Sequence, residues 1–476
     1  MRHIVGHMLS NNVYFFALKA FFPSAIKKNM ERTISLTRGS IRINLVKFAM
    51  PLFLGNLFQQ LYNAADSLIV GNFLGSEALA AVSSSSPLIF MMIGFFNGLA
   101  IGAGVVISRA YGAGDDGDLE KAVHTDIAFG LISGLVLTVF ASLFTPSILA
   151  LMKTPEDIMP NSIAYFRVYS LGILFSLMYN FLMGIMNAVG DSKHPLYYLI
   201  ISSITNVVLD LLFVGVLGLG VGSAAFATII SQAVSSLLCF IRLMRIRENY
   251  RIRIRSIRID GPTLRRIIRF GLPSGIQNSV IGFANTIVQT NINTFSSFAV
   301  AGSGAYSRIE GFAFLPITSF SLALTTFTGQ NLGAREYERA KRGALFGILC
   351  SIVMAEVIGL LFFIFAPHLI ALFNGRAEVV AYGTRQARIE SLFYLFLALS
   401  HAISGVLRGS GKAAIPMIIM FSVWCFLRVA YITIALSISH NIELIYSAYP
   451  VTWTISSILF IIYMKKADWL HGLEKR

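Results

Sequence analysis

Long apolar segments separated by short polar connections make up most of this chain. Twelve segments can be read as membrane-spanning helices, since roughly 18 consecutive apolar residues suggest a transmembrane span. They cover residues 44–70, 83–108, 122–147, 162–188, 195–215, 221–242, 266–294, 301–328, 344–366, 386–407, 414–436 and 446–464. The connections leave little room for a soluble domain, so the pattern predicts an all-α polytopic membrane protein.

Lysine and arginine are concentrated in every second connection. The segment before the first span is basic, and so are the connections around residues 109–121, 193, 242–269, 335–342 and 408–412 and the C-terminal tail. The alternate connections hold only Lys153, or Arg376 with Arg385. Because cytoplasmic loops carry the excess of positive charge, we expect both termini to be cytoplasmic and the protein to lie in the inner (plasma) membrane.

The composition agrees with a membrane protein. Charged residues make up 13% of the chain, whereas an ordinary soluble domain is about 25% charged. The net charge of +15 raises nucleic acid as a partner, but no aromatic platform or binding fold accompanies the arginine-rich segment 245–260. We interpret that segment as a cytoplasmic linker that touches anionic lipid headgroups, and we expect no nucleic-acid partner.

Three cysteines and the N-terminal segment add little chemistry. Cys239, Cys350 and Cys425 are far apart and have no metal-binding spacing, so we expect them to be buried apolar residues and expect no cofactor. Residues 1–43 contain one apolar run that is too short to span a bilayer. This leader is expected to be an interfacial helix or a disordered segment, and translation from Met30 would remove no predicted helix.

The two halves of the chain repeat one another at a nearly constant offset. Pairs in register include Gly112 with Gly333, Arg167 with Arg388, Gly190 with Gly411, Pro195 with Pro416, and Pro51 with Pro273. Each half has six predicted spans, so both halves begin on the same side and are related by an axis along the membrane normal. Two six-helix bundles facing one another across a central cleft are therefore predicted, an arrangement that permits alternating access.

The predicted domains follow from this repeat. They are a leader at 1–43, an N-terminal bundle at 44–244, a linker at 245–265, a C-terminal bundle at 266–465 and a tail at 466–476.

The first span carries a polar face that ends in an acid. Asn56, Gln59, Asn63 and Asp66 recur at steps of three, four and three, which places them on one side of a helix. A carboxylate inside a span is costly and usually functional. Asp66 lies fifteen residues beyond Pro51, and Asp210 lies fifteen residues beyond Pro195, so both acids lie about 22 Å from the cytoplasmic end.

Further polar residues accompany the two acids. Tyr62 is one turn before Asp66 and Asn206 is one turn before Asp210. Asn180 and Thr228 lie in the fourth and sixth spans. Two close carboxylates in a low-dielectric medium cannot both ionise cheaply, so such a pair holds a proton or a cation near neutral pH. Oxygen ligands from Asp66, Asn180, Asn206 and Asp210 would also suit sodium. The alternative is a structural role in hydrogen bonds between helices.

The second half lacks an equivalent acid pair, because the repeat matches Asp66 with Ile287 and Asp210 with Tyr431. Its polar residues are candidates for a substrate cleft. Together with Asn56, Gln59 and Asn63, the predicted cleft residues are Asn278, Asn285, Gln289, Glu310 and Glu356. The two glutamates are candidates for contact with a cationic substrate, although ion pairs with neighbouring arginines are an equal alternative. His401 is interpreted as a hydrogen-bonded core residue.

Several motifs resemble the multidrug and toxic compound extrusion (MATE) transporters. These are P-x4-N-x3-Q-x-Y-x3-D-x4-G-x3-G from Pro51, SRAYGAGD at 108–115, NAVGDSKHP at 187–195 and the segment 206–232. In the second half, GQNLGARE at 329–336 and VLRGSGKAAIP at 406–416 resemble the family as well. The likeness covers residues 44–465, which is nearly the whole chain.

The resemblance implies an antiporter with twelve helices that exports amphipathic, often cationic organic compounds in exchange for protons or sodium. In one branch of the family, the positions that match Asp66, Asn180, Asn206, Asp210 and Thr228 form the coupling site. Protonation there is thought to bend the first helix near the proline that matches Pro51. Another branch places acids in spans seven and ten, but this chain has no carboxylate around Ile281.

Ion-coupled export by a monomer in the lipid bilayer is therefore the leading hypothesis. A flippase for a lipid-linked precursor is the close alternative, but it would be expected to line its cleft with several cationic residues. An intramembrane enzyme would need a nucleophile, a His–Asp constellation or a metal cluster, and the eight scattered histidines form no such motif. We therefore do not expect an enzyme.

Overall fold

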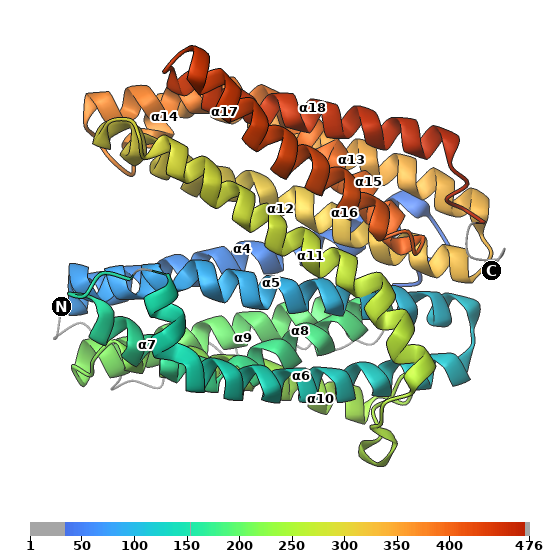
Figure 1. Ribbon diagram of the computed structural model, residues 1–476. Helices are drawn as coiled ribbons and strands as arrows, with labels where there is room; N and C mark the ends of the chain where they lie inside the picture. Colours follow the sequence, from blue (N-terminus) through green and yellow to red (C-terminus); the bar gives the residue numbers. More distant parts are fainter. Residues whose placement is uncertain (1–33, 153, 472–476) are drawn as a thin grey trace.

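The computed structural model describes residues 34–152 and 154–471. Most of the predicted leader and the last residues of the tail lie outside this part of the chain. Helices form two lobes that lie side by side along their length (Figure 1). The all-α fold predicted from the apolar segments is confirmed.

The first lobe contains the helices before residue 246. They are α4 (Ile41–Leu74), α5 (Ser76–Ala113), α6 (Asp116–Leu151), α7 (Met159–Leu171), α8 (Ile173–Ala188), α9 (Lys193–Asp210), the π-helical turn η1 (Leu211–Val216) and α10 (Gly222–Arg245). A linker with one short 3-10 turn, η2 (Ile254–Ser256), leads to the second lobe.

The second lobe repeats this order. It contains α11 (Gly261–Ile292), α12 (Ser297–Gly333), α13 (Tyr337–Ala371), α14 (Ala377–Glu390), the 3-10 turn η3 (Ser391–Phe393), α15 (Tyr394–Gly409), α16 (Ala414–Met420), the π-helical turn η4 (Phe421–Leu427), α17 (Arg428–Ile438) and α18 (Ile442–Lys466). The positive φ angles of Gly190 (93°) and Gly411 (80°) lie at matching turns of the two lobes, as the repeat predicts.

Ten helical segments of the described residues are long and apolar enough to cross a membrane. The bent pair α7 and α8, whose axes meet at 47°, makes an eleventh. Helix α11 is 32 residues long, about 48 Å at the usual rise, but Gln277, Asn278 and Asn285 make it more polar. If α11 is included, the described residues form the twelve helical segments that the sequence predicts.

The first helix of each lobe crosses into the other lobe at one end of the molecule. Leu45, Phe48 and Leu52 of α4 pack in the apolar core of the second lobe. Ile267 and Phe270 of α11 pack in the core of the first lobe. Figure 1 shows α11 running diagonally from one lobe to the other. Hydropathy alone did not predict this exchange, because it depends on which apolar face meets which partner.

The lobes meet tightly between α5 and α11. A Cβ atom added to Gly98 would lie 2.2 Å from the Gly275 nitrogen, and one added to Gly102 would lie 2.2 Å from the Gly271 nitrogen. No side chain fits at such an approach, so these glycines let the two backbones touch.

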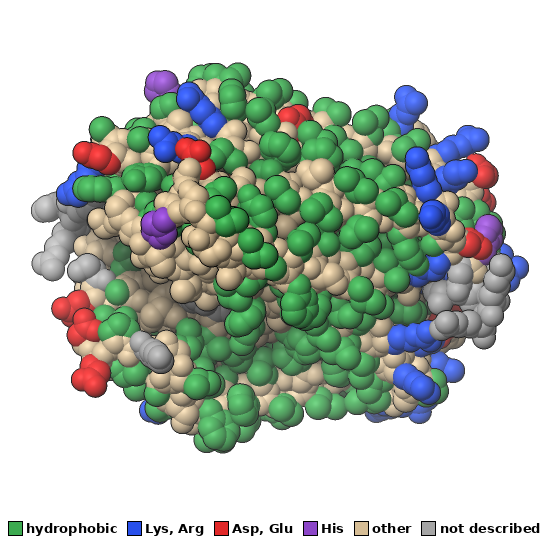
Figure 2. Space-filling view, turned by 45° about the horizontal axis from the view of Figure 1, so that its top comes forward, with side chains coloured by type: hydrophobic (Ala, Val, Ile, Leu, Met, Phe, Trp, Pro, Cys, Tyr) green, Lys and Arg blue, Asp and Glu red, His purple; other side chains and the backbone are tan. Residues whose placement is uncertain are grey.

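On the face shown in Figure 2, lysines and arginines gather mainly at one end of the molecule, where the helices exchange, and we call this the basic end. Figure 2 also shows the surface hollowed between the lobes toward the opposite end. The lobes are therefore joined at the basic end and separated at the other.

Candidate functional site

Asp66 of α4 and Asp210 of α9 come together inside the first lobe, as the matched depths predict. Their carboxyl groups are close enough to interact electrostatically. Asp210 is fully buried, and apart from the Asp66 carboxyl no group of the described residues hydrogen-bonds to its Oδ atoms. Asp66 is partly buried, and its Oδ1 atom also lacks any other partner there. Three carboxylate oxygens in this pocket can therefore accept a proton or a cation.

Amides and hydroxyls from neighbouring helices border the acids. The Asn206 Nδ2 atom donates to Thr228 Oγ1 at 3.5 Å, and Thr228 donates in turn to the Ala224 carbonyl. The Asn206 Oδ1 atom is buried without a hydrogen-bond partner in the described chain. The Asn180 Nδ2 atom donates to the Ser176 carbonyl of its own helix at 2.8 Å, which leaves its side-chain oxygen available.

Three tyrosines lie near the acid pair, and of these only Tyr62 was predicted. Tyr165 and Tyr169 of α7 stack with their rings 6.1 Å apart. Tyr165 interacts electrostatically with both Asp66 and Asp210, and Tyr169 interacts with Asp66. Their spacing of four residues in a predicted span was the available signal. The bend between α7 and α8, which brings this face inward, was not predictable from hydropathy.

A π-helical turn follows Asp210 directly. The turn η1 spans Leu211–Val216, and Asp210 is the last residue of the preceding α-helix. Such turns widen the helix and are frequent at functional sites. The second lobe has the reverse order, since the turn η4 ends at Leu427 and Arg428 follows it.

The predicted polar face of α4 divides between two environments. The Asn56 Nδ2 atom donates across the seam between the lobes, to Ser319 Oγ at 3.1 Å and Thr318 Oγ1 at 3.4 Å. Gln59 and Asn63 are exposed. Asn278, the repeat counterpart of Asn56, donates to the Gly94 carbonyl of α5 at 3.1 Å. Asn56 and Asn278 thus make equivalent contacts between the lobes.

The second lobe buries a charged network that the sequence did not assemble. Glu390 and Arg428 are both buried, and their charges interact with each other and with that of the partly exposed Glu310. Arg428 donates to Thr452 Oγ1 at 2.9 Å and to Asn285 Oδ1 at 3.4 Å. It also lies 4.3 Å from the centre of the Tyr449 ring. Glu310, which was predicted to line the substrate cleft, therefore lies near the positive charge of Arg428.

Three other residues named from the sequence have local partners in the second lobe. The Glu356 Oε2 atom accepts from the Leu395 N–H at 3.2 Å. This contact provides a partner for a backbone N–H just after the break in the helix at η3. The Gln289 Nε2 atom donates to Asn293 Oδ1 at 2.9 Å within the same helix end. His401 packs edge-on against Trp424, with ring centres 5.5 Å apart. Its Nε2 atom has no hydrogen-bond partner in the described residues, so the hydrogen bond expected for this histidine is not found at that atom.

One buried acid was missed altogether. Asp126 of α6 is 1% exposed, and neither carboxylate oxygen has a hydrogen-bond partner in the part of the chain described. It lies near the start of a predicted span, where hydropathy does not distinguish a loop acid from a buried one. Among the described residues, no group of three or more His, Cys, Asp or Glu could hold a metal ion.

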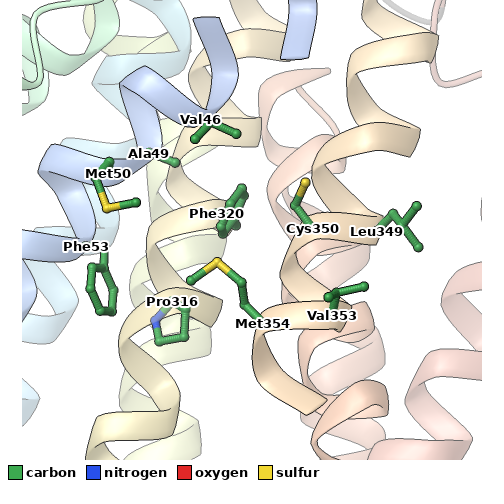
Figure 3. A pocket seen from close by; sticks show the side chains of 10 residues that line it. All are labelled: Val46, Ala49, Met50, Phe53, Pro316, Phe320, Leu349, Cys350, Val353 and Met354. Atoms are coloured by element: carbon green, nitrogen blue, oxygen red, sulfur yellow. The ribbon is translucent and has the colours of Figure 1, made fainter. Parts of the chain in front are cut away.

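An apolar cavity of about 280 Å³ lies between α4 and two helices of the second lobe, α12 and α13 (Figure 3). Its lining is entirely apolar apart from one thiol. The lining residues are Val46, Ala49, Met50, Phe53, Pro316, Phe320, Leu349, Cys350, Val353 and Met354. The cavity lies along the stretch of α4 that contains Pro51.

Together these features define a two-lobed membrane protein with a buried acid pair in one lobe. A family model described as MatE matches the chain twice, over residues 51–212 and 273–434. The two matches begin at Pro51 and Pro273, which are partners in the repeat, so the model detects the same internal duplication. The chain belongs to the MATE family of membrane transporters, as its motifs suggested.

Similar proteins support the same assignment. The chain is 29% identical over 440 residues to the probable multidrug resistance protein YoeA of Bacillus subtilis, covering 90% of this chain and 94% of that protein. It is 26% identical over 402 residues to the probable multidrug resistance protein NorM of Thermotoga maritima, covering 81% and 83%. A structure titled as the outward-facing conformation of a multidrug resistance MATE family transporter superposes with a TM-score of 0.86 at 24% identity, covering 92% of this chain and 98% of that one.

Proposed function

We propose that this protein is a secondary antiporter that exports amphipathic, cationic organic compounds in exchange for protons or sodium. The observation that carries the proposal is the pair Asp66 and Asp210, in which three carboxylate oxygens meet no group of the described residues other than the partner acid. Carboxylates without donors are energetically costly inside a membrane, and acids found there usually have a function. The names of the relatives, which describe multidrug resistance proteins, support the export of varied organic compounds.

The pair couples ion and substrate through its charge. Two ionised carboxylates at this separation repel one another in a low-dielectric site, so one proton or one sodium ion stabilises the pair. A substrate cation in the same lobe competes for that negative charge. Ion entry therefore favours substrate release, and ion release favours substrate binding. The same free-energy coupling acts in both directions.

The oxygen atoms around the pair suit either ion. Asp66, Asp210, Asn206 and Asn180 present carboxylate and amide oxygens, which are ligands for hard cations. A proton needs only one of the carboxylates. Tyr62, Tyr165 and Tyr169 add aromatic faces, which attract organic cations.

Alternating access requires that the lobes separate at each end in turn. The hollow between the lobes away from the basic end (Figure 2) supports an outward-facing state, with both termini on the cytoplasmic side. Pro51 leaves the Lys47 carbonyl without its helical hydrogen-bond partner. It therefore provides the place where α4 bends when the charge on Asp66 changes. In this account the protein works as a monomer in the inner membrane.

The test is dye efflux from proteoliposomes that contain the purified protein, under proton and sodium gradients imposed separately. We expect a cationic dye to leave the vesicles only when protons or sodium ions can flow inward down an imposed gradient, because binding of the ion at the acid pair favours release of the substrate. Liposomes with the same gradient and no protein provide the control. Equal efflux with and without either gradient would overturn ion coupling.

A further inference from the structure

The basic end carries two matching hydrogen bonds between the lobes. The Gln330 Nε2 atom of α12 donates to the Ala188 carbonyl at the end of α8, at 2.7 Å. The Arg109 Nη1 atom of α5 donates to the Ser410 carbonyl just after α15, at 3.2 Å. The repeat matches Arg109 with Gln330 and the end of α8 with the end of α15. Each lobe therefore donates a hydrogen bond to the end of the equivalent helix in the other lobe, α8 in the first lobe and α15 in the second.

Two glycines bring the backbones together between these bonds. A Cβ atom added to Gly112 would lie 2.0 Å from the Gln330 carbonyl oxygen, and one added to Gly333 would lie 2.2 Å from the Arg109 carbonyl oxygen. Gly112 and Gly333 are themselves partners in the repeat. The contact thus has the symmetry of the sequence repeat, and any added atom would push the lobes apart.

A strap formed by residues 34–39 lies over the same seam. The Ile34 N–H donates to the Gly190 carbonyl of the first lobe at 3.2 Å. The Leu36 carbonyl accepts from Asn331 Nδ2 at 3.2 Å and from Arg339 Nε at 3.0 Å, both in the second lobe. The Leu36 side chain is fully buried in the second lobe's core.

Arg339 fixes the rest of the strap. Its Nη1 atom donates to the Gly39 carbonyl at 2.7 Å and its Nη2 atom to the Arg38 carbonyl at 3.0 Å. All three of its nitrogens are thus committed to the strap backbone. Because the hydrogen bonds from a charged guanidinium are stronger than neutral ones, Arg339 is the main anchor.

We propose that the paired bonds of Arg109 and Gln330 form a latch that holds the basic end shut, and that the strap locks this latch. All these bonds must break for the basic end to open. The proposal rests on the alternating access described above, because only a protein that opens both ends needs a releasable closure. The latch acts through lobe separation and touches neither Asp66 nor Asp210.

The test is a distance measurement between spin labels on the full chain in lipid nanodiscs. Labels are attached at Asp116→Cys in the first lobe and Lys341→Cys in the second, both exposed positions at the basic end. Cys239, Cys350 and Cys425 are first replaced by alanine. Double electron–electron resonance then reports the lobe separation directly, whether or not the protein transports anything.

Three variants weaken the closure in different ways. Gly112→Ala inserts a methyl group into the seam, Gln330→Met removes one donor with little change of shape, and Arg339→Ala releases the strap. The control is Gly304→Ala in α12, where nothing lies within 4 Å of the added atom. Loss of one hydrogen bond raises the ratio of open to closed populations roughly fivefold.

We expect the parent and Gly304→Ala to share one short distance, and each latch variant to gain a longer one. If Gly112→Ala fails to fold, Gln330→Met and Arg339→Ala still decide the question. Unchanged distances in folded latch variants would overturn the latch even if dye efflux is normal. Longer distances in a protein that shows no efflux would leave the latch in place and overturn the proposed function instead.

Discussion

Asp66 of α4 and Asp210 of α9 are far apart in the sequence, yet their carboxyl groups interact directly inside the first lobe. No other group of the described residues donates to either Oδ atom of Asp210 or to Asp66 Oδ1, and the two carboxyl groups lie within hydrogen-bond reach of each other. An acid that served only to join helices would have its oxygens occupied. Here the two acids meet only each other, an arrangement suited to sharing one proton or cation, which favours an ion-binding role over a structural one.

The proline in α4 gives a first prediction. Pro51→Ala restores the N–H that the Lys47 carbonyl lacks, so α4 becomes harder to bend. We expect dye efflux from proteoliposomes to fall while the thermal unfolding midpoint stays the same or rises. Pro146→Ala in α6 is the control, because Pro146 is an exposed residue inside a helix that carries neither acid. Full efflux in Pro51→Ala would remove the bend from the mechanism.

The glycine seam gives a second prediction. Gly98→Ala places a methyl group 2.2 Å from the Gly275 nitrogen, and overpacking of this kind costs about 1–3 kcal/mol. We expect a lower thermal unfolding midpoint for the purified protein in detergent. Gly94→Ala, one turn away in the same helix, meets its nearest atom at 3.9 Å and should leave the midpoint unchanged. Because Gly→Ala by itself favours a helix, a drop of equal size in both variants would contradict the claim that the close approach at Gly98 is responsible.

The linker before α11 gives a third prediction. The His124 Nε2 atom accepts from the Arg253 N–H at 3.0 Å, and its Nδ1 atom donates to the Glu120 carbonyl at 2.7 Å. His124→Leu leaves the Arg253 N–H without this partner. We expect trypsin to cut the purified protein after Arg253 or Arg255 roughly fivefold faster, as the loss of about 1 kcal/mol implies. His368→Leu, exposed at the opposite end of the molecule, should be cut at the parent rate.

Asp260 gives a prediction about pH. Hydrogen bonds from the Thr263 hydroxyl and N–H, at 2.6 and 3.1 Å, lower the pKa of this partly exposed capping carboxylate. A lowered pKa in the folded state stabilises the protein above the ordinary pKa of aspartate, and this contribution disappears as the pH falls through the lowered value. Asp260→Asn should therefore reduce the thermal midpoint at neutral pH and converge with the parent in acid. Glu248→Gln, at an exposed acid of the same linker, should have the same thermal midpoint as the parent at each pH.

Much of the fold followed from the sequence because a membrane restricts the choices. A helix in lipid makes all its backbone hydrogen bonds within itself, so the length of an apolar segment predicts a membrane-spanning helix. The sequence repeat that pairs Pro51 with Pro273 predicts two lobes. The exchange of α4 and α11 between the lobes did not follow. Leu45 and Ile267 look like ordinary apolar residues, and only three-dimensional packing shows that each lies in the other lobe's core.

The candidate site was predictable where depth along a helix was enough. Asp66 and Asp210 lie at equal distances from their prolines, which was sufficient to pair them. Tyr165 and Glu390 were missed as site residues because their positions depend on the bend at Gly172 and the break at Ser391. Asn56 was expected in a cleft, whereas it bonds to Ser319 across the seam, since polarity alone does not distinguish the two surfaces.

The most direct test of the coupling account is ion-driven dye efflux by Asp66→Asn and Asp210→Asn. Each variant keeps the size of the side chain and removes the charge, so the ion loses its ligand while the fold is retained. The two variants and Asp116→Asn, an exposed acid at the basic end, are reconstituted at equal protein amounts under the gradient that drives the parent. We expect both pocket variants to lose gradient-driven efflux and Asp116→Asn to keep it. Normal efflux by either pocket variant would contradict the claim that the pair couples transport to the ion.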